Sequence, residues 1–129
     1  MKSKKRKIGD IGENIFVKHL VKHSYRILDR NYSKKWGEID IVAIKDKVLH
    51  FIEVKTVSVR YTLSDISDNY EPEENVHLWK LKRLSRAIQT YLAEKKVDDN
   101  AEWQVDVAAI FLDFRTKKAK IRITEDIGL

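Results

Sequence analysis

The sequence predicts an α/β domain in which helices cover a mixed β-sheet. Three observations lead to this class. An amphipathic helical pattern opens the chain, a pair of strongly strand-like segments follows, and a second helical pattern precedes two further strand-like segments. The expected order is therefore α-β-β-β-α-β-β, which suits a two-layer or three-layer arrangement. A length of 129 residues fits one compact domain, spanning 1–129.

The first helix is expected at residues 8–23, preceded by a basic N-terminal arm at residues 1–7. Apolar side chains in this segment recur at spacings of three and four residues and so form one stripe. Asp10 is expected to cap or charge the first turn. The stripe comprises Ile8, Ile11, Ile15, Phe16, His19 and Leu20.

Three strands are expected next. Residues 24–31 look like a short strand, and residues 37–45 and 48–56 are rich in β-branched residues. Only Asp46 and Lys47 separate the second and third strands. These two strands should therefore form a hairpin with a two-residue turn.

The second half of the chain begins with an unusually long acidic loop at residues 57–75, which holds the only proline, Pro72. Loops of this length in a compact domain are usually functional, or they hide an element. A long helix is expected at 76–96, and two closing strands at 103–114 and 118–125. The apolar stripe of this helix comprises Leu81, Leu84, Ile88, Tyr91 and Leu92.

The hairpin carries the candidate catalytic and metal-binding side chains. If its turn has two residues, Asp40 lies opposite Glu53 and Glu38 lies opposite Lys55, with all four on one face. The opposite face is almost wholly apolar, so the hairpin should be central in a sheet that is covered on both sides. That apolar face comprises Ile39, Ile41, Ala43, Val48, Ile52 and Val54.

Facing carboxylates repel each other, and a divalent cation offsets that cost well. Mg²⁺, or Mn²⁺ in its place, takes oxygen ligands and needs only one or two carboxylates beside waters and phosphate. Asp40 and Glu53 are the candidate ligands. Lys55, two residues from Glu53, can orient an attacking water or neutralise charge on a phosphate. The alternative is an ordinary salt-bridge cluster of these side chains with Glu38.

The charge balance favours a polyanionic partner. The formal net charge is +6 and the isoelectric point is about 9.4. Basic residues of the N-terminal arm and of the second helix are candidates for phosphate contacts, which position nucleic acid without reading its sequence. The alternative is a solvated basic surface. The candidates are Lys4, Lys5 and Arg6 in the arm and Lys82, Arg83 and Arg86 in the helix.

Composition excludes some classes of protein. The chain has no cysteine, so neither disulfides nor thiolate metal sites are possible. No apolar stretch follows the basic start, as a secretory signal would require, and no apolar run approaches the roughly 20 residues that cross a bilayer. We therefore expect a cytoplasmic protein without a membrane association.

Other candidates have plain structural alternatives. His19 and His23 have the i, i+4 spacing of a zinc pair but lack an evident third ligand, so a structural role is favoured. Asp106 lies among apolar neighbours, where pairing with a basic core group is favoured over a place in the site. Gly9 and Gly12 would allow backbone to approach a phosphate, or simply permit tight helix packing. Nucleotide contacts are also conceivable for Trp36, Arg60 and Tyr61.

Several motifs occur together and in order along nearly the whole chain. They are Gly9-Asp10-Ile11-Gly12-Glu13, Asn31, Gly37-Glu38-Ile39-Asp40-Ile41-Val42-Ala43 and Phe51-Ile52-Glu53-Val54-Lys55, then Lys82-Arg83-Leu84, Ala87, Tyr91-Leu92 and Val105-Asp106-Val107. With them the chain resembles the YraN family of uncharacterised nuclease-like proteins. That family is similar to archaeal Holliday-junction resolvases and other members of the PD-(D/E)XK superfamily.

The resemblance implies a restriction-endonuclease-like mixed β-sheet flanked by helices, in a single PD-(D/E)XK nuclease-like domain. It places Asp40 at the "PD" aspartate, Glu53 and Lys55 at the (D/E)XK pair, and Glu13 at a helix glutamate that assists metal binding. Resolvases of this fold act as dimers, so a homodimer is also implied. Two departures are Ile39 in place of proline and the acidic stretch 57–75, where a shorter and more basic segment is expected.

Three hypotheses follow. The first is a Mg²⁺- or Mn²⁺-dependent endonuclease acting on DNA, including branched or flap DNA, with Asp40, Glu53, Lys55 and Glu13 as catalytic or metal-binding residues. The second is a nucleic-acid-binding module with a nuclease-like fold and no turnover. The third is a structural or protein-interaction domain, favoured only by the acidic loop.

Overall fold

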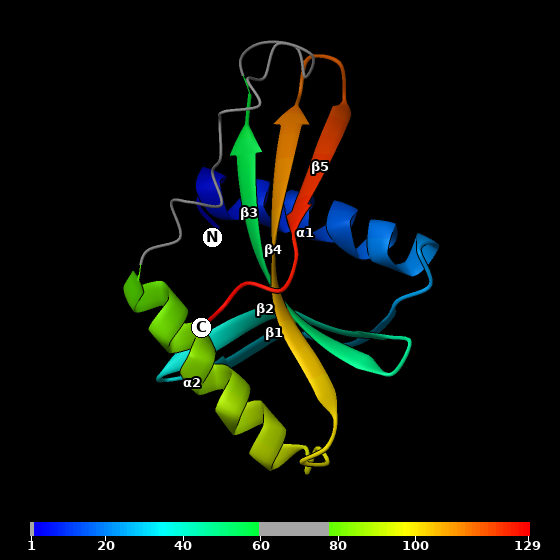
Figure 1. Ribbon diagram of the computed structural model, residues 1–129. Helices are drawn as coiled ribbons and strands as arrows, with labels where there is room; N and C mark the ends of the chain where they lie inside the picture. The colour runs from blue at the N-terminus through cyan, green and yellow to red at the C-terminus, as the bar shows by residue number, and fades with distance from the viewer. Residues whose placement is uncertain (1, 60–77) are drawn as a thin grey trace.

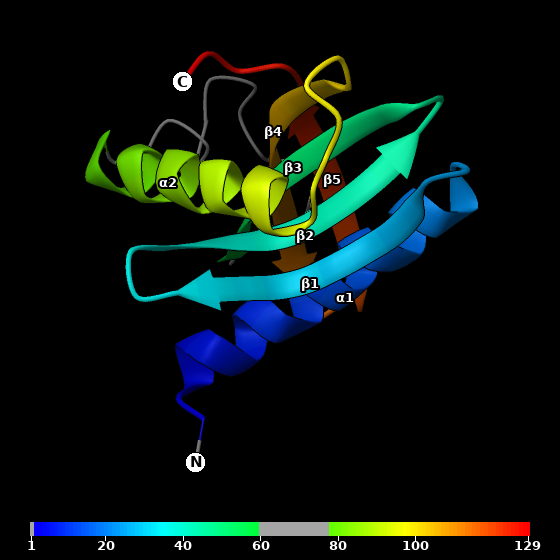
Figure 2. The same cartoon turned by 90° about the horizontal axis from the view of Figure 1, so that it is seen from below.

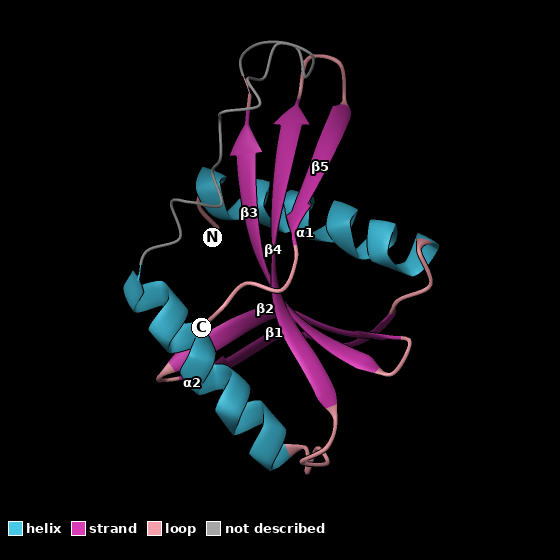
Figure 3. Ribbon diagram, in the orientation of Figure 1, coloured by secondary structure: helices cyan, strands magenta, loops and turns pink. Residues whose placement is uncertain are grey.

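The computed structural model describes residues 2–59 and 78–129 and confirms the expected α-β-β-β-α-β-β order (Figures 1 and 3). Five strands form one sheet in the order β1-β2-β3-β4-β5, and two helices flank it. The elements are α1 (Lys4–Lys22), β1 (Arg26–Lys34), β2 (Gly37–Lys45), β3 (Val48–Ser58), α2 (Leu78–Glu94), β4 (Glu102–Asp113) and β5 (Lys118–Thr124). This is the expected restriction-endonuclease-like α/β architecture.

The sheet is mixed. β1, β2 and β3 form an antiparallel meander, β3 and β4 pair in parallel, and β4 and β5 pair antiparallel. A parallel pair requires a crossover, and α2 lies in the connection between β3 and β4. The sheet twists so strongly that β1 and β2 cross the direction of the other three strands (Figure 1). α1 and α2 lie on opposite faces of it (Figure 2).

Each helix covers its own apolar cluster. Under α2, Phe51 of β3 packs with Leu84 and Ile88 of the helix. Under α1, Phe16 and Leu20 of the helix pack with residues of β2, β3 and β4, among them Ile41, Ile52 and Ile110. The hairpin β2–β3 contributes to both clusters, so it is central and covered on both sides, as its sequence predicts.

The start of α1 differs from the prediction. The helix begins at Lys4 and not at residue 8, because Ser3 is the N-cap and its side chain accepts a hydrogen bond from the Arg6 amide at 3.1 Å. The basic residues expected in an arm therefore form the first turn of α1. Asp10 is consequently not a first-turn residue; it pairs with Lys2 at 2.6 Å.

Two strands are longer than expected. β1 continues to Lys34 because its pairing with β2 runs on to Gly37. β3 continues to Ser58, which pairs with Leu112 of β4. The expected loop 57–75 thus begins inside β3, and its remainder from residue 60 lies outside the described residues, as does the start of the helix expected at 76–96.

The register of the hairpin is confirmed: Lys45 pairs with Val48, and the ladder continues to Ile41 opposite Ile52. One part of the face assignment is wrong. Ile39 belongs to the cluster under α2, whereas Ile41 belongs to the cluster under α1. The last main-chain pair between β2 and β3, counted from the turn, is Ile41 with Ile52. The residues of β2 before Ile41, beginning with Asp40, are no longer held in register with β3.

Two glycines mark close contacts between a helix and the sheet. A Cβ atom on Gly12 of α1 would lie 2.1 Å from Oγ1 of Thr56 in β3. A Cβ atom on Gly37 of β2 would lie 1.9 Å from the main-chain oxygen of Arg83 in α2. The alternative of tight packing therefore accounts for Gly12, and both helices sit against the sheet near the open end of the hairpin.

Candidate active site

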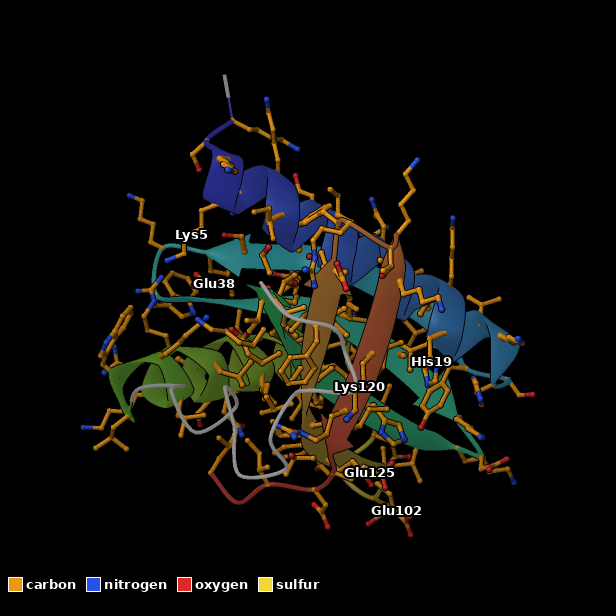
Figure 4. The ribbon with its side chains drawn as sticks, turned by 90° about the horizontal axis from the view of Figure 1, so that it is seen from above. Lys5, His19, Glu38, Glu102, Lys120 and Glu125 are labelled. Carbon is orange, nitrogen blue, oxygen red and sulfur yellow. The ribbon has the colours of Figure 1, made fainter. Side chains whose placement is uncertain are left out.

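A cavity of about 990 Å³ opens where β2 and β3 separate, beside the first turns of α1. Elements far apart in sequence line it, and its walls combine acidic and basic side chains. Lys5 of α1 and Glu38 of β2 mark this side of the molecule in Figure 4, whereas His19 marks the other end of α1. The residues that matter here are Lys5, Glu13, Asn31, Asp40, Lys55 and Lys80.

Asp40 lines this cavity and lies close to the buried Glu53. The Asp40 Oδ2 atom accepts a hydrogen bond from the amide of Val54 at 2.8 Å, in the gap where the two strands part. Burial, followed by the charge of Glu53 and a hydrogen bond with it, raises the pKa of Asp40 to about 7; the Val54 amide acts in the opposite direction. The two carboxyl groups are therefore close together, as expected, although the main-chain pairing of β2 with β3 stops at Ile41 and Ile52, one residue short of them.

Glu53 is held by a lysine from the opposite helix. The Nζ atom of Lys80, in the first turn of α2, lies 2.5 Å from Oε1 of Glu53. The Glu53 side chain is only 4% exposed, whereas that of Lys80 is 36% exposed and borders the cavity. Burial lowers the pKa of Lys80, but the hydrogen bond and charge of Glu53 outweigh it and the pKa is raised. Lys80 was not among the site residues expected from the sequence.

Glu13 has its own partners. Its Oε1 atom accepts hydrogen bonds from Nε and Nη2 of Arg30 at 3.1 and 3.0 Å and from Nδ2 of Asn31 at 3.1 Å. Burial raises the pKa of Glu13, the hydrogen bond from Arg30 lowers it, and the nearby charge of Asp40 raises it again. The positive φ of Asn31 (53°), which asparagine tolerates, accompanies this placement in β1.

Lys55 lines the cavity and has no ion-pair partner within residues 2–59 and 78–129. Glu53 is therefore neutralised by Lys80 and not by Lys55, although Lys55 is only two residues away in the sequence.

The carboxyl groups near the cavity provide some of the oxygen ligands that a hard divalent cation requires, but not a full set. Asp40 and Glu53 present two adjacent carboxyl groups, which is the number that Mg²⁺ often takes from a protein. No group of three or more His, Cys, Asp or Glu side chains is arranged to hold a metal ion in the described part of the chain. Glu13 instead faces Arg30 and Asn31, so its expected role as a metal ligand stays a prediction.

The basic candidates divide into two groups. Lys4, Lys5 and Arg6 all line the cavity, beside the acidic pair. The candidates of α2 do not border it, and one of them is engaged elsewhere: Arg83 pairs with Glu38 at 3.0 Å. The α2 candidates were Lys82, Arg83 and Arg86.

The remaining candidates have local roles. His23 bonds through Nδ1 to the main-chain oxygen of His19 at 2.7 Å, and the two rings stack. Asp106 of β4 lies opposite Ile52 and pairs with buried His50 at 2.7 Å, which fits the favoured pairing with a basic core group. Trp36 donates from Nε1 to Oγ1 of Thr90 at 2.8 Å. The candidates Arg60 and Tyr61 lie outside the described residues.

Fold and site together define the class: an α/β protein of restriction-endonuclease-like fold, with two opposed carboxyl groups at the open end of its central hairpin. The model of the uncharacterised protein family UPF0102 matches residues 12–110, and the chain belongs to this family, which is the YraN-like family of the sequence resemblance.

Relatives match over most of their length. A UPF0102 protein of Campylobacter hominis is 38% identical over 126 residues, which cover 98% of this chain and 97% of the relative. One of Caldicellulosiruptor bescii is 34% identical over 122 residues, covering 94% and 96%, and one of Campylobacter fetus is 37% identical over 100 residues, covering 77% and 79%. Neither helix of the described chain has the length and apolar character needed to span a membrane.

Proposed function

We propose that this protein is a metal-dependent endonuclease that hydrolyses DNA phosphodiesters, with branched DNA among its substrates. The observation that carries the proposal is the closeness of Asp40, which lines a cavity with a basic rim, to the buried Glu53. Two buried carboxyl groups in contact cost free energy unless a proton or a cation lies between them. A site that keeps this arrangement beside a surface suited to phosphates has the parts of a phosphodiesterase.

Asp40 and Glu53 would hold the ion, Mg²⁺ or Mn²⁺, because both present hard oxygen donors from rigid strands. When bound, such an ion polarises a phosphoryl oxygen and lowers the pKa of a bound water. Glu13 lies close enough for its charge to act on Asp40, and would support the acidic pair from α1.

The other residues bind and orient. Lys55 lines the cavity, where its amine would position the attacking water or offset charge that develops on the phosphate. Lys4, Lys5 and Arg6 would hold the phosphates on either side of the scissile bond without reading bases. A homodimer would place two such sites for cleavage of both strands, and we include it in the proposal.

A second candidate is a nucleic-acid-binding module of the same fold without turnover. Two observations favour it: Glu53 is already paired with Lys80, and no three-ligand group exists among the described residues. In this reading the cavity and its basic rim bind phosphate groups, and the acidic pair serves only the fold.

A cleavage assay separates the two functions. Purified protein is incubated with plasmid, single-stranded and four-way-junction DNA in Mn²⁺ or in EDTA, beside Asp40→Asn and Lys55→Met variants. Both substitutions keep side-chain shape, so folding is expected to survive. Cutting that requires Mn²⁺ and disappears in both variants supports the endonuclease. Retarded migration of DNA without cutting, under all conditions, supports the binding module.

A further inference from the structure

Two acidic side chains at or beside the cavity are each paired with a cation from another element. Glu13 of α1 pairs with Arg30 of β1 at 3.0 Å, and Glu53 of β3 pairs with Lys80 of α2 at 2.5 Å. Asp40 differs, because among the described residues its polar contacts are the amide of Val54 and the carboxyl group of Glu53. Within residues 2–59 and 78–129, Lys80 is therefore the cation that forms an ion pair with the central acidic pair.

We propose that Lys80 is an internal counter-cation, which occupies Glu53 in the metal-free protein and which a divalent metal ion must displace. The proposal rests on the metal-binding function above and adds a regulatory element to that site. Lys80 is thus a positioning residue: it keeps the two carboxyl groups together before the metal arrives.

Burial of the two partners is unequal, and this favours displacement of the lysine. The Glu53 side chain is 4% exposed and fixed on a central strand, so it has no route into solvent. The Lys80 side chain is 36% exposed, stands in the first turn of α2 and borders the cavity. A lysine stem with four rotatable bonds can carry its ammonium group from Glu53 into the cavity without burying it further.

The neighbouring cations are less suited to this role. Arg83, one turn further along α2, is bound to Glu38 at 3.0 Å and to the main-chain oxygen of Lys35 at 3.4 Å. Lys55 has no ion pair among the described residues and faces the cavity. Once displaced, the Lys80 amine would join Lys55 beside an incoming phosphate, so that one movement both vacates the metal site and adds a phosphate contact.

The proposal fixes the direction of a measurable change. Because metal and Lys80 compete for Glu53, an uncharged side chain of similar length should bind metal more tightly. We expect Lys80→Met to lower the dissociation constant for Mn²⁺ by about tenfold, the effect of removing one competing charge from a partly buried site. Lys80→Arg keeps the charge and should stay within about threefold of the wild type.

Isothermal titration of Mn²⁺ into the full chain, without DNA, tests this. Lys18→Met is the matched control, because Lys18 is an exposed helical lysine of α1 that does not border the cavity. It removes the same unit of charge and should leave affinity unchanged. Thermal unfolding gives a second readout: in EDTA, Lys80→Met should melt below the wild type, and saturating Mn²⁺ should shrink that difference.

The outcomes separate the two proposals. If the wild type binds Mn²⁺, Asp40→Asn does not, and Lys80→Met binds equally or more weakly, then Lys80 is no competitor and the metal site stands. If Lys80→Met and Lys18→Met gain affinity alike, the gain is a general charge effect and the inference is overturned. If the wild type binds no Mn²⁺ that depends on Asp40, the proposed metal function itself fails, and the counter-cation role with it.

Discussion

Asp40 and Glu53 come from neighbouring strands of the central hairpin, and the two carboxyl groups lie close together just past the last main-chain pair between those strands, where burial and the charge of Glu53 raise the pKa of Asp40. The Asp40 side chain accepts the amide of Val54 there. The same departure from regular pairing that opens the cavity thus also places the acidic pair beside it.

Asp40 should reduce the stability of the metal-free protein at neutral and higher pH. Its pKa is raised from 3.8 to about 7, so the folded state holds this proton more tightly than the unfolded state does. The resulting stability is fully present below about pH 4 and is lost as pH rises through about 7. Asp40→Asn keeps an oxygen for the Val54 amide and supplies an N–H to Glu53.

In EDTA at pH 8 we therefore expect Asp40→Asn to unfold about 4 °C above the wild type, equivalent to roughly 1 kcal/mol. Below pH 5 the two melting temperatures should converge. Thermal unfolding followed by circular dichroism from pH 4 to pH 9 measures this. A variant that is less stable than the wild type at pH 8 would show that the two carboxyl groups do not repel each other.

Metal binding should be linked to this proton. Because a carboxylate must be deprotonated to bind a cation, Mn²⁺ has to displace the proton on Asp40 whenever the pH lies below about 7. Affinity for Mn²⁺ should fall by up to about tenfold per pH unit below that value and level off above it. Calorimetry in two buffers of different ionisation enthalpy counts the protons released. A pH-independent affinity between pH 5.5 and 8 would contradict the linkage.

The contact between α1 and β3 should not tolerate a methyl group. In Gly12→Ala the new Cβ would lie 2.1 Å from Oγ1 and 2.6 Å from Cγ2 of Thr56, so α1 must move away from the sheet. We expect a loss of about 2 kcal/mol, in the range for overpacked contacts. Urea unfolding measures it.

Gly9→Ala is the matched control, since nothing lies within 4 Å of its Cβ position and the residue is inside the same helix. Alanine in place of glycine in a helix should add about 0.5–1 kcal/mol. A gain in Gly12→Ala like that expected for Gly9→Ala would show that helix propensity, and not the contact with Thr56, decides the effect at residue 12.

Binding of DNA should depend on the basic first turn of α1 more than on the basic side of α2. Lys5 and Arg6 border the cavity, whereas Lys82 and Arg86 do not. We expect Lys5→Ala with Arg6→Ala to reduce the slope of log affinity against log salt by about 1–2, as each lost phosphate contact contributes nearly one. Lys82→Ala with Arg86→Ala should change it less. Fluorescence anisotropy at several salt concentrations measures both slopes, and EDTA is present so that the DNA is not cleaved. A larger reduction of the slope in the α2 variant than in the α1 variant would place the DNA on α2.

Much of the fold could be predicted, because the apolar patterns along the sequence match the faces that are buried in the structure. The β2–β3 register follows from a two-residue turn and two apolar faces, and so did the meeting of Asp40 with Glu53. The first turn of α1 was missed because Ser3 is an N-cap whose effect on a run of lysines is not visible as apolar periodicity.

The partners of the acidic residues were harder to predict. Lys80 reaches Glu53 only because the crossover brings α2 back over β3, and no spacing along the chain encodes that contact. Arg30 is a similar case, since it meets Glu13 through the packing of β1 against α1. The sequence indicates only that basic residues lie near the start of the helix after the hairpin. This does not distinguish Lys80 from Lys82 or Arg83.

The most direct test of the account is a crystal of the full chain soaked in Mn²⁺ and measured for anomalous scattering at a wavelength where manganese scatters strongly. The account predicts one peak between the carboxyl groups of Asp40 and Glu53, roughly 2.0–2.3 Å from an oxygen of each, with the amine of Lys80 moved away from Glu53. A peak at any other position, or none while Lys80 still holds Glu53, would contradict it.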